Sequence, residues 1–145
     1  MNFLLRDTPT PRQLDISLAI LRLVLGIVFI AHGGQKLFVF GLDGVTAGFT
    51  QMGAPLPAIT APLVAFTELL GGIALVIGLL TRVAAAGLAI TMLGATFIAH
   101  LPNVFFAPGG IEFTLTLFAG ALALAFTGAG HLSADHKFAH RRLAS

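Results

Sequence analysis

LDISLAILRLVLGIVFIAH, residues 14–32, is an apolar stretch long enough to cross a membrane, and TAPLVAFTELLGGIALVIGLL, residues 60–80, is a second. A bilayer core about 30 Å thick takes roughly 20 apolar residues to span. Each stretch nevertheless carries one charge near its midpoint, Arg22 in the first and Glu68 in the second. A charge at the centre of a membrane helix costs about 2.5–3.5 kcal/mol and usually faces the protein interior, where it is paired. We therefore predict an intramembrane ion pair between Arg22 and Glu68.

The composition supports a membrane protein. The chain has 145 residues, of which 57% are hydrophobic and 10% are charged, whereas about a quarter of a soluble domain is charged. Four segments are apolar enough to span a bilayer, and we place them at about residues 14–33, 60–80, 82–101 and 111–127. The predicted fold is an all-α integral membrane four-helix bundle with antiparallel neighbours, contained in one domain over residues 14–130.

The connections complete this organisation. Residues 1–13 form a polar lead-in, and residues 131–145 form a basic tail that we expect to be mobile. The first connection, residues 34–59, is the longest, and within it residues 44–52 predict a short helix lying at the membrane interface. The helix would be stopped by Gly53 and the prolines that follow it.

The basic residues predict the orientation. Of the eight Lys and Arg residues, six precede the first span, follow the last or lie between the second and third: Arg6, Arg12, Arg82, Lys137, Arg141 and Arg142. Lys36 is the one basic residue of the opposite connections. The positive-inside rule then places both termini in the cytoplasm. This distribution accounts for the basic pI without nucleic-acid binding.

Glycine spacing predicts how the helices approach one another. Gly71 and Gly78 are seven residues apart, as are Gly87 and Gly94, so each pair shares a helix face. Small residues let membrane helices pack closely. In the first span, Gly26 and Gly33 share a stripe with Arg22, Phe29 and Lys36. We expect this stripe to contact the other helices.

A second polar cluster is expected at the outer ends of the spans. We predict a small-molecule site formed by His32, Lys36, His100 and Glu112, because three spans bring ionisable groups to one depth. A quinone site needs a hydrogen-bond donor and a proton acceptor, which these side chains supply. The alternative is structural, with Lys36 extending to water and pairing with Glu112 while His32 and Asn103 cap helix ends.

Other chemistry has weaker support in the sequence. His32, His100 and Glu112 have the composition of a two-histidine, one-carboxylate metal site, but no diagnostic spacing, so no metal is assigned. The chain contains no Cys and no haem-attachment, flavin or nucleotide motif. Whether it is an enzyme therefore stays open, and any redox centre would be carried by a partner protein.

Four phrases of the sequence together resemble the DoxX family of small four-helix membrane proteins. They are RLVLGIVFIAHGGQKLF, GFTQMGAPLP, FTELLGGIALVIGLLTR and HLPNVFFAPGGIEF, and they cover roughly residues 21–130 in family order. The resemblance implies a bacterial plasma-membrane protein related to the small subunit of thiosulfate:quinone oxidoreductase. The charged positions of these phrases are occupied here by Arg22, Lys36, Glu68, Arg82 and Glu112, and the resemblance implies no catalytic role for them.

Three functions follow as hypotheses. The first is a membrane subunit or accessory protein of a quinone-linked redox system, in which a quinone is the candidate ligand and Glu68 is protonatable or, with Arg22, anchors the head group. The second is a membrane scaffold or assembly protein with no chemistry. The third is a small transporter, which would need to form a homo-oligomer because four spans are few.

Overall fold

A computed structural model describes residues 8–100, 105–106 and 110–143 of the chain. All regular secondary structure within these ranges is helical, which confirms the predicted all-α class. The helices are α1 (Pro11–Gly34), α2 (Gly41–Gln51), α3 (Pro57–Ile77), α4 (Thr81–Ala95), α5 (Glu112–Thr127) and α6 (Ala134–Leu143). Two π-helical segments, Gln35–Phe40 and Thr96–His100, continue α1 and α4 respectively.

The beginning of α1 is fixed by local hydrogen bonds. The Thr10 hydroxyl accepts a bond from the Gln13 N–H at 3.3 Å, and the Gln13 side chain accepts one from the Thr10 N–H at 2.8 Å. This capping box, with Pro11 as the first helical residue, satisfies donors that a helix start leaves open. The helix therefore begins at Pro11, ahead of the apolar stretch that marks the predicted span.

Three helical stretches in the described part of the chain are long and apolar enough to cross a membrane: Pro11–Gln51, Pro57–Ile77 and Thr81–Ala99. The fourth predicted span corresponds to α5, a shorter apolar helix of 16 residues, or about 24 Å at 1.5 Å per residue. Large apolar side chains also face outward on these helices, as at Ile27 (61% exposed) and Phe126 (75% exposed). A surface of this kind suits a bilayer.

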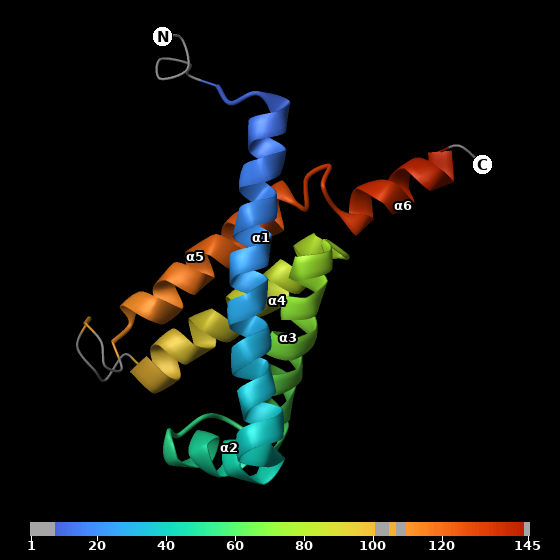
Figure 1. Cartoon of the computed structure of the whole chain (residues 1–145). Helices are drawn as coiled ribbons and strands as arrows, with labels where there is room; N and C mark the ends of the chain where they lie inside the picture. The colour runs from blue at the N-terminus through green and yellow to red at the C-terminus, as the bar shows by residue number, and fades with distance from the viewer. Residues whose placement is uncertain (1–7, 101–104, 107–109, 144–145) are drawn as a thin grey trace.

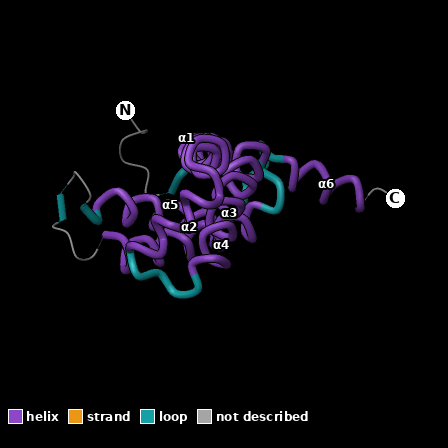
Figure 2. Tube along the Cα trace, turned by 90° about the horizontal axis from the view of Figure 1, so that it is seen from below, coloured by secondary structure: helices purple, strands orange, loops and turns teal. Residues whose placement is uncertain are grey.

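The helices are arranged as two pairs that cross (Figure 1). α1 lies along α3, and α5 returns alongside α4. In Figure 1 the α4–α5 pair runs obliquely across α1 and α3, and Figure 2, which looks nearly along α1, shows the same crossing. α2 lies crosswise beyond the end of α1, which we call the α2 end of the molecule, and α6 projects at the opposite, α6 end.

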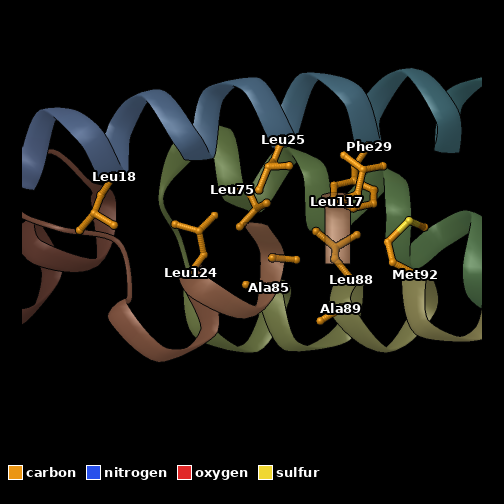
Figure 3. Close-up of a cluster of buried hydrophobic side chains, with 11 residues drawn as sticks. Leu18, Leu25, Phe29, Leu75, Ala85, Leu88, Ala89, Met92, Leu117 and Leu124 are labelled. Carbon is orange, nitrogen blue, oxygen red and sulfur yellow. The ribbon is translucent and has the colours of Figure 1, made fainter. Parts of the chain in front are cut away.

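The core forms where the two pairs cross (Figure 3). Side chains from all four long helices meet there, and the cluster includes Leu18, Leu25 and Phe29 of α1, Leu75 of α3, Leu88 and Met92 of α4, and Leu117 and Leu124 of α5. The predicted stripe of α1 is confirmed as its packed face, because Arg22, Gly26, Phe29 and Gly33 are all buried.

The C-terminal tail contains a helix, which the sequence did not predict. α6 follows a turn that is tied to the rest of the molecule: the Asp135 carboxylate accepts hydrogen bonds from the N–H groups of Leu80 (2.7 Å) and Thr81 (3.0 Å) at the start of α4. The His131 ring is 2.8 Å from the Asp15 carboxylate of α1. The tail is thus anchored through side chains whose partners lie more than 50 residues away.

Candidate functional site

Arg22 is buried, and within the described part of the chain it forms no salt bridge with a carboxylate. Its guanidinium donates hydrogen bonds to three backbone carbonyls: those of Leu75 at the end of α3 (3.2 Å), Ala129, and Leu132 (2.8 Å) in the turn after α5. Only 3% of Arg22 is exposed. Gly78 makes room for the group, because a Cβ there would lie 3.0 Å from the guanidinium carbon. Arg22 therefore joins three segments of the chain by backbone contacts.

The predicted Arg22–Glu68 pair does not form, and the register of α1 on α3 explains why. A Cβ at Gly26 would lie 2.8 Å from the Gly72 carbonyl, and one at Gly33 would lie 2.8 Å from the Leu69 Cα. The two helices are thus antiparallel, with Leu69 opposite Gly33. Since Arg22 precedes Gly33 by 11 residues, it lies about 16 Å along the helix from the level of Glu68.

Glu68 is paired with Lys36 instead. The Lys36 ammonium donates a hydrogen bond to Glu68 Oε2, and the two groups form a salt bridge. The Glu68 side chain is 3% exposed and that of Lys36 is 20% exposed. Removing ions from water costs several kcal/mol per ion, which close pairing offsets. The alternative in which Lys36 reaches water and pairs with Glu112 is not what the structure shows.

This pair was missed although one signal for it was present. Lys36 belongs to the same stripe of α1 as Gly33, and the chain continues helically through Gln35–Phe40. Lys36 therefore stays on the face that contacts α3. The sequence shows which face of α1 contacts α3, but not how far α1 is shifted along α3. That shift determines whether Arg22 or Lys36 lies beside Glu68.

A cavity of about 580 Å³ opens beside the ion pair, between α3 and α4. The two helices touch at one level, where a Cβ on Gly71 would lie 3.0 Å from the Leu88 Cγ. Farther toward the α2 end they diverge, and nothing lies within 4 Å of the position that a Cβ would take at Gly94. The oblique crossing of the helix pairs thus leaves a wedge of space.

The walls of this cavity are almost wholly apolar. Lys36 and Glu68 supply its charges, and its other lining residues include Leu63, Val64, Ile90 and Ile98. Phe49 of α2, with Met52 and Pro55 after it, lines it as well. Gly94 therefore leaves room for the cavity and does not mediate the close helix contact predicted for it, whereas Gly71 does pack closely.

A second cavity, of about 180 Å³, shares the ion pair. It is lined by Lys36, Glu68 and His32, together with Thr114 and apolar side chains of α1, α4 and α5. The His32 ring lies against Phe113, with ring centroids 5.6 Å apart. The structure therefore gathers His32, Lys36 and Glu68 around one point, with a cavity on either side of the pair.

The other predicted site residues are placed differently or not described. Glu112 begins α5, beside Gly110, and is not a lining residue of either cavity. His100 ends a π-helical segment, but its side chain lies outside the described residues, as does Asn103. Among the described residues, no group of three His, Asp or Glu side chains could hold a metal ion.

The histidines of the tail form a separate cluster with edge-to-face ring contacts. The rings of His131 and His136 are 4.5 Å apart, and those of His136 and His140 are 4.3 Å apart. Desolvation lowers the pKa of His136, and the neighbouring His140 and His131 act in the same direction. This histidine cluster lies at the α6 end, away from the ion pair and its cavities.

The family model for DoxX matches residues 17–101 of the chain. The chain belongs to the DoxX family. It is 33% identical to the Bacillus subtilis protein named "Putative oxidoreductase CatD", over 86% of this chain and 88% of that protein. It is 31% identical to an uncharacterised membrane protein of Mycobacterium tuberculosis (88% and 85% covered) and 31% identical to the inner membrane protein YphA of Escherichia coli (84% and 90% covered). No solved structure matches it.

The part of the chain that matches DoxX contains the whole of the main cavity. Every residue that lines it lies between Lys36 and Ala99, and Arg22 is inside the match as well. α5 and α6 lie beyond it. The ion pair and the wedge between α3 and α4 are therefore built by the DoxX part of this membrane protein.

Proposed function

We propose that this DoxX protein is the quinone-binding membrane subunit of a redox system, and that the cavity between α3 and α4 is the quinone site. The observation that carries the proposal is the cavity's composition: an apolar space of about 580 Å³ that meets one buried ion pair, Lys36–Glu68. Small-molecule sites are commonly apolar pockets with a few polar groups that orient the ligand.

The pair supplies the two groups that a quinone head requires. The Lys36 ammonium can donate a hydrogen bond to a ring carbonyl, and the Glu68 carboxylate can accept a proton from a quinol hydroxyl. The apolar walls suit the ring. Because the chain contains no Cys, a separate partner would carry the redox centre. The name of CatD as a putative oxidoreductase agrees with such a system.

The proposal includes a membrane arrangement. α1, α3, α4 and α5 would cross a bacterial plasma membrane as antiparallel spans, with both termini in the cytoplasm and α2 lying in the outer interface. The cavity would then open in the outer half of the bilayer, because its lining residues belong to the α2 ends of α3 and α4. YphA, a relative named as an inner membrane protein, supports the choice of membrane.

Binding is tested on the purified protein in phosphatidylcholine nanodiscs, with and without added ubiquinone or menaquinone. Ligand at a hundredfold excess over its dissociation constant stabilises the folded state by about 2.7 kcal/mol, which raises the melting temperature. Mass spectrometry of the protein purified with its native lipids should also detect the quinone.

The variant that tests the site removes both charges together. Lys36→Met/Glu68→Leu leaves no unpaired buried ion, so it should fold and lose the quinone-dependent rise in melting temperature. As a control, Lys137→Met replaces a lysine on the exposed face of α6, outside the cavity. This variant should keep the quinone-dependent rise in melting temperature. If no quinone changes the melting temperature of the wild-type protein, the quinone proposal is wrong and the scaffold hypothesis is favoured.

A further inference from the structure

The main cavity has an open side between α3 and α4. Leu63 on α3 and Ile90 on α4 both line it, and they are 62% and 71% exposed. Side chains so exposed at mid-helix face lipid in a membrane-embedded molecule. The cavity is therefore reached through an apolar gap that faces the bilayer.

The two ends of the gap are occupied by side chains. At the α2 end Phe49, Met52 and Pro55 line the cavity. At the other end the helices close together, with Thr67 Cγ2 3.4 Å from the position of a Cβ on Gly87. The route between these ends passes Gly94, where the space is open.

We infer that the ligand enters sideways from the bilayer, with its polar head on the Lys36–Glu68 pair and a long apolar chain leaving between Leu63 and Ile90, past Gly94. This rests on the proposed function and names the ligand class more narrowly: a quinone with a polyisoprenyl chain, and not a water-soluble quinone. Gly94 is then the residue that determines chain specificity, because any larger side chain there occupies the path of the chain.

The apolar border of the gap and the shape of the cavity support a ligand that carries an apolar chain. A water-soluble ligand would have to leave water and pass the exposed apolar side chains of Leu63 and Ile90 that border the gap. A ligand already dissolved in the bilayer meets no such cost. A single chain also fits a wedge that narrows toward Gly87 and widens toward Gly94.

The experiment compares two ligands, a quinone ring with a polyisoprenyl chain and the same ring without it, on three proteins in phosphatidylcholine nanodiscs. The proteins are the wild type, Gly94→Leu, and the matched control Gly48→Leu. Gly48 also has nothing within 4 Å of a Cβ, but it lies on α2 and does not line the cavity. Gly94→Ala, with a smaller side chain in the same open space, provides a graded variant.

We expect the chain to tighten binding to the wild type and to the Gly48→Leu protein. Gly94→Leu should lose most of that gain, about tenfold in dissociation constant, while it keeps the affinity for the ring alone, and Gly94→Ala should fall between. Equal affinity of the wild type for both ligands would overturn the inference and leave quinone binding standing. The inference would also fail if Gly94→Leu kept the full gain in affinity that the chain gives. It would fail as well if Gly94→Leu weakened binding of the ring alone as much as binding of the ligand with the chain. Binding of neither ligand to the wild type would reject the proposed function itself.

Discussion

Glu68 is the residue whose replacement should reveal the buried pair most directly. Glu68→Leu leaves the Lys36 ammonium without the partner that the structure gives it, and breaking a buried pair in this way costs about 3–5 kcal/mol. Lys36→Met should cost a similar amount for the converse reason. The double variant should recover part of each loss, as measured by thermal unfolding in detergent or nanodiscs. Losses that simply add would show that the two side chains do not interact.

Arg22 should behave differently at the same scale. Arg22→Leu removes the donor that the carbonyls of Ala129 and Leu132 share, and each unsatisfied buried group costs about 1–3 kcal/mol. The Leu75 carbonyl loses the same donor but keeps a hydrogen bond from the Gly78 N–H at 3.2 Å. Because Glu68 is not its partner, combining Arg22→Leu with Glu68→Leu should give additive losses of stability. A double variant more stable than Arg22→Leu alone would show that Arg22 and Glu68 do interact, as the sequence predicted.

These two residues show where sequence reasoning stops. Their burial was predictable, since a charge within an apolar span must face the protein interior. Their partners were not predictable. The three acceptors of Arg22 are backbone carbonyls, and every residue has one, so residue type does not identify them. The ion pair in turn depends on how far α1 is shifted along α3, and that offset is set by the close contact of Gly33 with Leu69.

Among the helices, the glycines divide into those that pack and those that leave space. Gly33→Ala would bring a Cβ to 2.8 Å from the Leu69 Cα, so α1 and α3 must move apart, at a cost of about 1–3 kcal/mol for overpacking. Gly94→Ala meets nothing within 4 Å and should keep the stability of the wild type. The two melting temperatures make the comparison, and a loss in Gly94→Ala as large as that in Gly33→Ala would contradict the wedge between α3 and α4.

The sequence predicted the positions of the helices better than their contacts. The apolar spans correspond to α1, α3, α4 and α5, and the breakers after Gly44–Met52 correctly indicated the end of α2. Identical seven-residue glycine spacing, however, did not indicate identical roles. Gly71 and Gly87 lie where α3 and α4 approach each other, whereas Gly78 follows the end of α3 and Gly94 lines the cavity. Spacing reports which residues share a face, and the crossing of the helix pairs then determines whether that face meets a helix or a cavity. α6 was missed because its polar sequence lacks a span's apolar pattern and its anchor is the distant pair of N–H groups that Asp135 binds.

For the whole molecule, the distribution of basic residues predicts that both termini are cytoplasmic. A reporter that is active only in the cytoplasm should work when fused after Ser145 and fail when inserted at Gly53, in the turn between α2 and α3. A reporter active only outside should give the reverse pattern. Activity of one reporter at both positions would overturn the topology and with it the assignment of the cavity to the outer half of the bilayer.

The three contacts of Arg22 have a consequence for biogenesis. α1 enters the membrane early in synthesis, but the carbonyls of Ala129 and Leu132 come from residues made more than 100 positions later. Until then the Arg22 guanidinium lacks two of the three acceptors that it has in the folded protein. A chain ended after Thr127 should therefore be degraded quickly in a pulse-chase experiment, whereas one ended after Ser133 retains both acceptors and should last longer. Equal lifetimes would contradict this order of events. If the difference is found, a single early arginine makes the survival of the protein depend on completion of α5 and the turn after it.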